Sequence, residues 1–322
     1  MPDIKLLNLM RPEIEALIDH DQAAKAIENA YRALSRGAVN NPAVGHIVFP
    51  EEDGDCHIKY GHIRGDAVFV IKIATGFPRN ARFGLPNGNG LSVVLSAVTG
   101  EVRAVLHDEM KLTDIRTGLG GAIASRLLSR RNSRRVVIVG TGIQSRQQIE
   151  AHATLLGADL EFLVWGRSRE AAARVVEECA DHATIGVSDD LETACRLADI
   201  VVTTTGAKSP LIRRAWIRRG THITAVGADA PGKQELSNDL VAASDRLVAD
   251  LASQSLDHGE FSTPAKAGLI DPERLVELGA ILNGSAEGRT TEEQITIADL
   301  TGVAAQDIAM ARLVIEAASG QG

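Results

Sequence analysis

Residues 136–145 read Val-Val-Ile-Val-Gly-Thr-Gly-Ile-Gln-Ser, an apolar strand that runs through a Gly-x-Gly turn into the start of a helix. The first glycine, Gly140, permits the tight turn, and the second, Gly142, lets the backbone approach a pyrophosphate group at the positive end of the helix. The third small position of the Gly-x-Gly-x-x-Gly pattern is Ser145 or Arg146, so the motif is incomplete. Its place at the start of a strand-and-helix series favours dinucleotide binding.

Strands and helices alternate from residue 136 onward, which predicts a parallel sheet with crossover helices. Helices are expected between the strands, including Gln144–Leu156, Arg169–Ala180 and Asp190–Ala198. The predicted strands are Val136–Val139, Glu161–Trp165, Ile200–Thr204, His222–Val226, Arg246–Ala249 and Ile295–Ala298.

The chain before residue 112 has a different pattern. Helical periodicity predicts helices at Glu13–Asp19 and Gln22–Leu34, with Asp21 as the cap of the second. Short runs separated by Gly, Pro, Asn and Asp then predict an antiparallel sheet or barrel. These runs are Gly45–Phe49, Asp55–Lys59, Val68–Ala74, Leu91–Ser96 and Val102–Leu106.

Two further helices complete the expected fold. One runs from about Leu112 to Ser129 and ends in the basic run Arg130–Arg135, which is most simply a solvated turn. The last, Val303–Ala318, could extend from the nucleotide-binding region or fold back on the first part of the chain.

Composition narrows the class of protein. At 322 residues the chain is longer than one hydrophobic core usually serves, so two domains or one large α/β domain are expected. A hydrophobic content of 44% excludes wholesale disorder. The apolar runs fall far short of the roughly 18–20 residues that span a bilayer, and no secretory signal is recognised. A net charge of −8 argues against a broad nucleic-acid surface.

The cysteines and histidines give no metal or disulfide pattern. Cys56, Cys179 and Cys195 are isolated and odd in number, so a disulfide framework and structural zinc are not expected, and a reducing cytoplasm fits. The nine histidines form no HxxxH or HExxH spacing, and no metal is assigned. We expect a cytoplasmic α/β protein without a nucleic-acid or membrane partner.

Two lysines in neighbouring predicted strands suggest an anion site. Lys72 lies in the middle of an apolar run, and because lysine is almost never buried without a partner, it faces either solvent or a functional cavity. Lys59 could face the same pocket, and two converging cations suggest an anionic substrate such as a carboxylate. Asp229 lies at the carboxyl end of a predicted parallel strand, where ligands bind, although a loop aspartate is also a common turn former.

The end of the second strand of the nucleotide region usually selects the cofactor, because an acidic residue there bonds to the ribose 2′-hydroxyl of NAD. Here Trp165-Gly166-Arg167-Ser168 has no carboxylate. Arg167 can stack on adenine or pair with a 2′-phosphate, and Ser168 can donate to that phosphate; otherwise Arg167 is a surface arginine. This pattern favours NADP(H) over NAD(H).

Six blocks in order resemble the ornithine cyclodeaminase/μ-crystallin family, which also contains alanine dehydrogenases and cyclic ketimine reductases. The resemblance spans almost the whole chain, and the G-x-D-x-P-G-K-x-E-L pattern of residues 227–236 is its most specific part. The blocks are Lys72 and residues 112–117, 138–145, 202–205, 221–236 and 295–302.

The resemblance implies a fold and an assembly. A Rossmann dinucleotide-binding domain, residues 119–303, is inserted in an α+β domain for substrate binding and dimerisation, residues 1–118 plus 304–322. The protein is then expected to form a homodimer and to bind a small amino or imino acid.

The resemblance also implies residue roles. Lys72 binds the substrate carboxylate, Arg116 reaches substrate and cofactor, and Thr301 faces the substrate. Asp229, also beside the cofactor, exchanges a proton with the substrate nitrogen. Further residues are expected at the cofactor, including those of the glycine turn. They are Asn87, Gly140, Thr141, Gly142, Ile143, Gln144, Thr205, Val226, Gly227, Lys233 and Leu300.

Two departures from the family pattern bear on the substrate. Cyclodeaminases hold the substrate carboxylate with an arginine on the first strand, where this chain offers only His46. Lys59 stands where cyclodeaminases carry a glutamate and alanine dehydrogenases an arginine, and a cation suits a carboxylate better than a terminal amine. We therefore expect an NAD(P)-dependent imine reductase or amino-acid dehydrogenase. A cyclodeaminase that releases ammonia and a non-catalytic NADP- or ligand-binding protein remain the alternatives.

Overall fold

The computed structural model describes residues 6–157 and 159–320. The chain divides into two compact units. Unit 1 comprises Met1–Arg116 and Val303–Gly322, and unit 2 comprises Thr117–Gly302.

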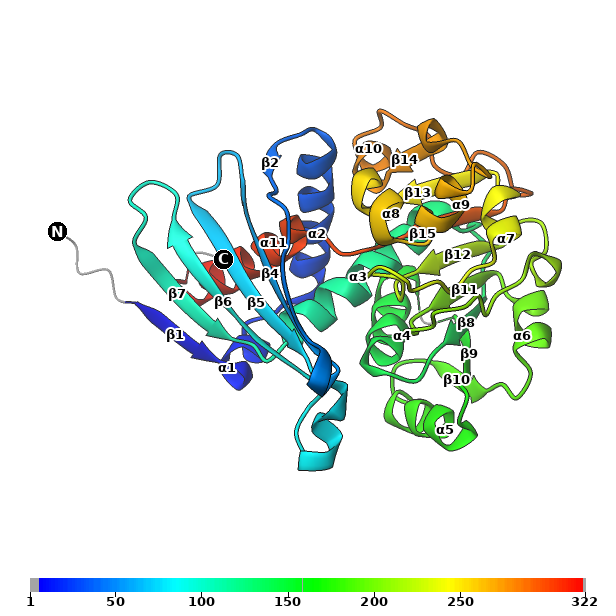
Figure 1. The fold of residues 1–322 in the computed structure, drawn as a ribbon, viewed down its shortest axis with the longest axis horizontal. Helices are drawn as coiled ribbons and strands as arrows, with labels where there is room; N and C mark the ends of the chain where they lie inside the picture. The colour runs from blue at the N-terminus through cyan, green and yellow to red at the C-terminus, as the bar shows by residue number, and fades with distance from the viewer. Residues whose placement is uncertain (1–5, 158, 321–322) are drawn as a thin grey trace. The chain divides into compact units, whose positions relative to one another are not determined.

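Unit 1 is built on an open sheet in the order β1-β7-β6-β5-β4-β2 (Figure 1). Strand β3 also pairs with β4. Neighbouring strands are antiparallel except for β1, which runs parallel to β7. The strands are β1 (Leu7–Met10), β2 (Val39–Asn40), β3 (Gly45–Phe49), β4 (Gly54–Ile63), β5 (Val68–Gly76), β6 (Gly88–Ser96) and β7 (Val102–His107), with 3-10 turns η1 (Pro50–Glu52) and η2 (Pro78–Phe83).

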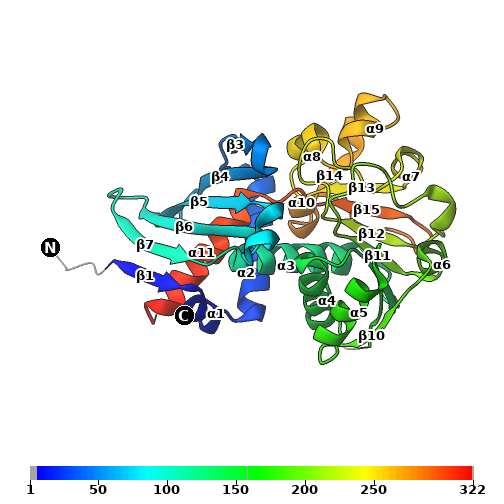
Figure 2. The same cartoon turned by 60° about the horizontal axis from the view of Figure 1, so that its bottom comes forward.

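Three helices accompany this sheet: α1 (Arg11–Ala16), α2 (His20–Ser35) and α11 (Ala304–Ala318). The last helix folds back on unit 1, where it packs against α2, β4 and β5 (Figure 2). The apolar face of α2, which includes Ile27 and Tyr31, is buried. The predicted cap of α2 was wrong: the helix begins at His20, and the Asp19 carboxylate, not that of Asp21, accepts the Gln22 N–H at 2.8 Å.

Unit 2 is an eight-stranded parallel sheet in the order β10-β9-β8-β11-β12-β15-β13-β14. Chain order reverses at β8, between β9 and β11, and such a switch point opens a ligand crevice at the carboxyl ends of the strands. The strands are β8 (Arg135–Val139), β9 (Glu161–Trp165), β10 (Thr184–Val187), β11 (Ile200–Thr203), β12 (His222–Ala225), β13 (Arg246–Ala249), β14 (Leu275–Glu277) and β15 (Thr296–Asp299).

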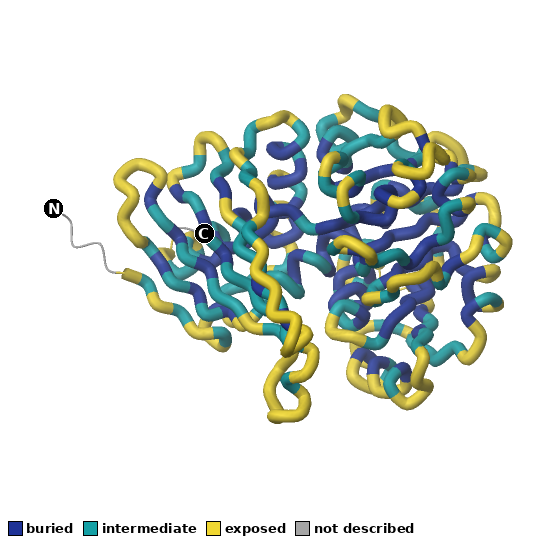
Figure 3. Tube along the Cα trace, in the orientation of Figure 1, coloured by how far each residue is buried: buried dark blue, intermediate teal, exposed yellow. Residues whose placement is uncertain are grey.

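Helices cover both faces of the unit 2 sheet, so its central strands are buried on both sides (Figure 3). In β8, Val137 and Val139 face one core, and Val136 and Ile138 face the other. The helices are α3 (Lys111–Leu128), which begins in unit 1, α4 (Ile143–Leu156), α5 (Arg169–Glu178), α6 (Leu191–Leu197), α7 (Asn238–Ala242), α8 (Ala252–His258), α9 (Ser262–Lys266) and α10 (Leu278–Leu282), with 3-10 turns η3 (Arg214–Trp216) and η4 (Pro272–Arg274). In the described part of the chain, no helix combines the length and the apolar character needed to cross a membrane.

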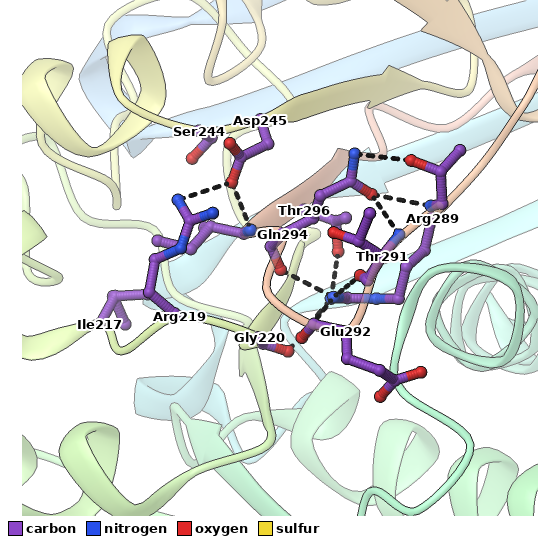
Figure 4. A network of polar contacts seen from close by, with 12 residues as sticks. Ile217, Arg219, Gly220, Ser244, Asp245, Arg289, Thr291, Glu292, Gln294 and Thr296 are labelled. Atoms are coloured by element: carbon purple, nitrogen blue, oxygen red, sulfur yellow. Dashed lines mark hydrogen bonds and ion pairs between the residues drawn. The ribbon is translucent and has the colours of Figure 1, made fainter.

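At the amino-terminal edge of the unit 2 sheet, arginines bind backbone carbonyl groups and a carboxylate. Arg289 donates to the carbonyl oxygen of Gln294 at 2.7 Å and to the hydroxyl of Thr296 at 3.1 Å (Figure 4). It also donates to the carbonyl oxygen of Leu128 at 2.6 Å. In the basic run, Arg130 pairs with Asp199 at 2.6 Å. These arginines satisfy carbonyl and carboxylate groups at the strand and loop ends of this edge.

Candidate active site

Lys72 of β5 is buried and paired. Alternation along β5 places it on the same inward face as Val68 and Val70, and only 5% of the residue is exposed. Its Nζ donates to the Asp307 carboxylate at 3.0 Å. The Arg116 Nε donates to the same Asp307 oxygen at 2.7 Å. One buried carboxylate on α11 therefore joins two predicted substrate-binding cations.

The first turn of α11 supplies two residues that the sequence analysis missed, Gln306 and Asp307. Gln306 accepts a hydrogen bond from the Arg116 Nη1 at 3.0 Å and donates to the Tyr31 hydroxyl at 2.9 Å. The sequence does contain a signal for these two residues, since they are polar and interrupt the apolar run of residues 303–311. Polar groups that are buried on a helix need partners.

Charge in this cluster is unevenly balanced. Burial lowers the pKa of Lys72, although Asp307 opposes that shift. Burial would raise the pKa of Asp307, but Arg116 and Lys72 lower it to about 2, so the carboxylate stays ionised. Lys59 pairs directly opposite Lys72 across β4 and β5. Burial raises the pKa of the neighbouring Asp108. Two buried cations, Lys72 and Arg116, therefore share one ionised carboxylate, an arrangement that suits a further small anion.

In unit 2, the turn after β8 has the backbone that a dinucleotide requires. Gly140 has a φ of 132°, and a Cβ there would meet the Thr204 hydroxyl oxygen at 2.3 Å. Gly142 is the N-cap of α4, and a Cβ there would meet no atom within 4 Å. Ile143 is 55% exposed. An open helix N-terminus beside an exposed apolar side chain fits a pyrophosphate and its flanking rings.

The loops after β11 and β12 are tied together by a buried glutamate, Glu235. Its carboxylate accepts the Thr205 N–H at 2.6 Å and the Gly227 N–H at 3.0 Å. A Cβ at Gly227 would meet the Thr205 carbonyl oxygen at 2.2 Å, so only glycine fits there. Glu260 in turn accepts the Glu235 N–H at 2.6 Å. Thr205 and Gly227 are thus held rigidly at the strand ends, next to the buried Val226.

The segment after β15 is held in the same way. Asp250, which follows β13, accepts the Thr301 hydroxyl at 3.1 Å and the Gly302 N–H at 2.7 Å. Leu300 and Thr301 are buried. Burial, with Asp250 nearby, raises the pKa of Asp299 to about 7. Leu300 and Thr301 were predicted from sequence, whereas Asp250, which binds Thr301 and Gly302, was not.

The remaining predicted residues lie on exposed or half-buried loops. Asp229 is exposed, and its carboxylate accepts a hydrogen bond from the Lys233 Nζ at 2.5 Å. Arg167 is exposed, whereas the Ser168 hydroxyl caps α5 and donates to Glu170 at 2.7 Å. Asn87 lies in the exposed loop before β6, and half-buried Thr141 and Gln144 flank the Gly142 turn.

Comparison with known proteins agrees with this architecture. The chain is 39% identical over 323 residues to an uncharacterized cyclodeaminase of Sinorhizobium fredii, a match that covers 99% of this chain and 97% of the relative. An archaeal alanine dehydrogenase dimer with bound NAD has a TM-score of 0.90 at 33% identity, covering 98% of this chain and 97% of that chain. The pyrroline-2-carboxylate reductase of Thermococcus litoralis, in complex with NADH and L-proline, has a TM-score of 0.91 at 28% identity, covering 98% of both chains.

These relatives bear on the predictions. They confirm the α/β fold class with a Rossmann-type domain and the assignment to the oxidoreductases. They also support a nicotinamide dinucleotide as the cofactor, and one of them is a dimer. The ornithine cyclodeaminase/mu-crystallin family model matches residues 6–322, and this chain therefore belongs to that family.

Proposed function

We propose that this protein transfers hydride between a nicotinamide cofactor and the C–N centre of a small α-imino or α-amino acid, as an imine reductase or amino-acid dehydrogenase. The observation that carries the proposal is the buried cluster of Lys72 and Arg116 around Asp307, with Lys59 directly opposite Lys72. A surplus of positive charge on buried, fixed side chains favours an α-carboxylate.

Lys59 favours this reaction over cyclodeamination. A cyclodeaminase must accept a diamino acid, whose second amine is cationic at neutral pH. Lys59 and Lys72 face each other across two strands, so a further ammonium group beside them would be repelled. An imino acid that carries only a carboxylate meets no such penalty.

The proposed roles follow from what each residue can donate or accept. Lys72, Arg116 and Lys59 bind the substrate carboxylate, which fixes the orientation of the reacting carbon. Thr301 is proposed to face the substrate. Asp229 gives or takes the proton at the substrate nitrogen, and Lys233, already bonded to it, keeps its carboxylate oriented. The bound nicotinamide supplies or accepts the hydride.

The proposed cofactor is NADP(H), bound by unit 2. Gly140, Gly142 and the amino end of α4 are proposed to hold the pyrophosphate. The other proposed contacts are Asn87, Arg116, Thr141, Ile143, Gln144, Thr205, Val226, Gly227, Asp229, Lys233 and Leu300. Arg167 and Ser168 are proposed to bind the 2′-phosphate, since the segment Trp165–Ser168 carries no carboxylate that would repel it. Phosphate would then replace Glu170 as the acceptor of the Ser168 hydroxyl.

A homodimer is proposed as the assembly. Unit 1 exposes several large apolar side chains along β3 and around η2, and exposed clusters of this kind favour protein–protein contact. They are Ile47, Val48, Phe49, Phe83 and Leu85, each at least 40% exposed. Light scattering coupled to gel filtration tests this assembly, because a monomer mass at micromolar concentration contradicts it.

A substrate panel tests the proposed reaction. Purified protein is mixed with NADPH or NADH and with pyruvate plus ammonia, pyruvate plus methylamine, or a cyclic imino acid, and absorbance at the nicotinamide band is followed. Consumption of the reduced cofactor with one of these acids is the expected result. Ammonia release from ornithine without net cofactor turnover would instead identify a cyclodeaminase. Cofactor binding with no turnover on any substrate would identify a binding protein.

A further inference from the structure

Pairing of β3 with β4 brings together two histidines and an aspartate that are separated in the sequence. His46 lies directly opposite His57 in the antiparallel register. Asp55 is two residues before His57 on β4, so both project from the same face of the sheet. The two imidazole ring centroids are 4.3 Å apart. No local sequence spacing reveals this group, because it depends on the strand register.

The three side chains converge on a small volume. The Nε2 of His57 lies 3.3 Å from the Asp55 Oδ2, and the Nε2 of His46 lies 3.8 Å from the same oxygen. One ligand atom from each residue can be chosen so that all three lie within 4.8 Å of one another. Around a tetrahedral zinc ion with bonds of about 2.0–2.1 Å, ligand atoms are roughly 3.3–3.4 Å apart. Small side-chain rotations would therefore complete the geometry.

We propose that His46, Asp55 and His57 form a binding site for a divalent transition-metal ion. Two imidazole nitrogens and one carboxylate oxygen are a ligand set that zinc and similar ions accept, with one or more positions left for water or another ligand. An ion pair between a carboxylate and one histidine needs no second imidazole directed at the same oxygen. The second imidazole is what a metal site requires.

The neighbouring strand leaves room for the ion and its ligands. Ala74 and Gly76 of β5 lie opposite His57 and Asp55. A Cβ at Gly76 would meet the Asp55 Oδ1 at 2.9 Å, so a larger residue would displace the carboxylate. His46 and Asp55 are each 42% exposed at the side chain, which gives an ion access from solvent.

A bound ion would extend the line of positive charge on this face. Lys59 is two residues beyond His57 on β4, and alternation places it on the same face, opposite Lys72. The carboxylate of Asp55 offsets the repulsion between the ion and Lys59. A coordination position of the ion that no protein side chain occupies would take an oxygen ligand. The inference depends on the geometry of unit 1 alone and does not require the proposed reaction.

Zinc binding to the full-length, tag-free protein tests the proposal. Protein stripped with a chelator is titrated with zinc chloride in a calorimeter, and the affinity is checked by competition with a chromophoric chelator. The variants His46→Gln and His57→Gln each remove one ligand, and Asp55→Asn weakens the third. His107→Gln, on β7, is the matched control because its Nε2 is hydrogen-bonded to Asn8 at 3.0 Å. Circular dichroism and thermal melting without metal verify that each variant folds.

The expected result is one zinc ion per chain at micromolar or tighter Kd. Loss of a residue that merely orients a ligand costs roughly 10–100-fold in metal affinity, so removal of either histidine ligand should cost at least that much. His107→Gln should bind as the native protein does. X-ray absorption at the zinc edge should give two imidazole ligands. Binding weaker than millimolar, or equal affinity in the native protein and the His46→Gln and His57→Gln variants, would overturn the proposal.

Discussion

Replacing Asp307 by asparagine should destabilise unit 1 by about 2–5 kcal/mol at pH 7. The side chains of Lys72, Arg116 and Asp307 are 6%, 6% and 5% exposed, so the substitution leaves two buried cations without their shared carboxylate. Removing one partner of a buried ion pair costs about 3–5 kcal/mol. The pKa of Asp307, lowered from 3.8 to about 2, gives a separate value of about 2.5 kcal/mol by linkage.

The pH dependence of this loss follows from the sign of the pKa shift. Because the folded pKa of Asp307 is lowered, its contribution is fully present above the unfolded pKa of 3.8 and is lost as pH falls toward about 2. The stability difference between native protein and Asp307→Asn should therefore be constant from pH 7 to pH 5. It should fall to about half by pH 3.

Urea unfolding followed by two probes can assign the loss to unit 1. Both tryptophans, Trp165 and Trp216, belong to unit 2, so tryptophan fluorescence reports that unit. Amide hydrogen exchange over α11 reports unit 1, and far-UV circular dichroism reports both. Asp307→Asn should increase exchange in α11 more than it shifts the fluorescence transition.

A matched variant and a double-mutant cycle make the result decisive. Glu52→Gln is the same chemical change in unit 1, at an exposed pair with Arg82, and should cost at most about 1 kcal/mol. In a Lys72→Met background, Asp307→Asn should cost roughly 1–3 kcal/mol less, because one buried cation is already gone. If Asp307→Asn costs no more than Glu52→Gln, the cluster is not the buried network inferred here.

Three further predictions concern unit 2. Asp229→Asn should lower kcat by about 100-fold or more while the Kd for NADPH changes far less, and near-normal turnover would remove Asp229 from proton transfer. Arg167→Ala should reduce the preference for NADPH over NADH by roughly tenfold, measured as the ratio of dissociation constants; equal constants in the native protein would contradict this reading. Asp299 has its pKa raised from 3.8 to about 7, mainly by burial, so the folded state keeps a proton that the unfolded state releases, and stability falls between about pH 4 and pH 7. The free energy of unfolding of Asp299→Asn in urea, relative to that of the native protein, should therefore be higher at pH 8 than at pH 4 by roughly 1 kcal/mol or more. An equal difference at the two pH values would disprove the pKa shift.

Much of unit 2 could be predicted from sequence because its signals are local. A strand buried on both faces is a continuous apolar run, and five predicted strands match β8, β9, β11, β12 and β13 to within one residue. The sixth, β15, lies one residue later than predicted. The strands that were missed, β1, β2, β10 and β14, have at most four residues and lie at the edges of their sheets. Edge strands that short carry too little periodicity to identify.

Most of the groupings in unit 1 could not be predicted because they depend on contacts distant in sequence; the convergence of Lys59 and Lys72 is the exception. Lys72 and Asp307 are 235 positions apart, and only the return of α11 to the first sheet brings them together. The opposition of Lys59 to Lys72, and of His46 to His57, depends on strand register. A shift of one residue would send one member of each pair to the other face. From the residue type alone it could not be decided whether the side chain of Lys72 faces solvent or a cavity.

Asp307 explains how a buried cluster can still attract an anion. Burial alone lowers the pKa of Lys72, and a neutral amine would hold a carboxylate only weakly. The Asp307 carboxylate favours the protonated form of Lys72, but Arg116 draws on the same oxygen and Lys59 lies opposite Lys72. The single carboxylate of Asp307 is therefore shared by two buried cations and does not balance both. A second ionised carboxylate, supplied by the substrate, would complete the balance, which is why an acid inside the cluster strengthens the case for anion binding.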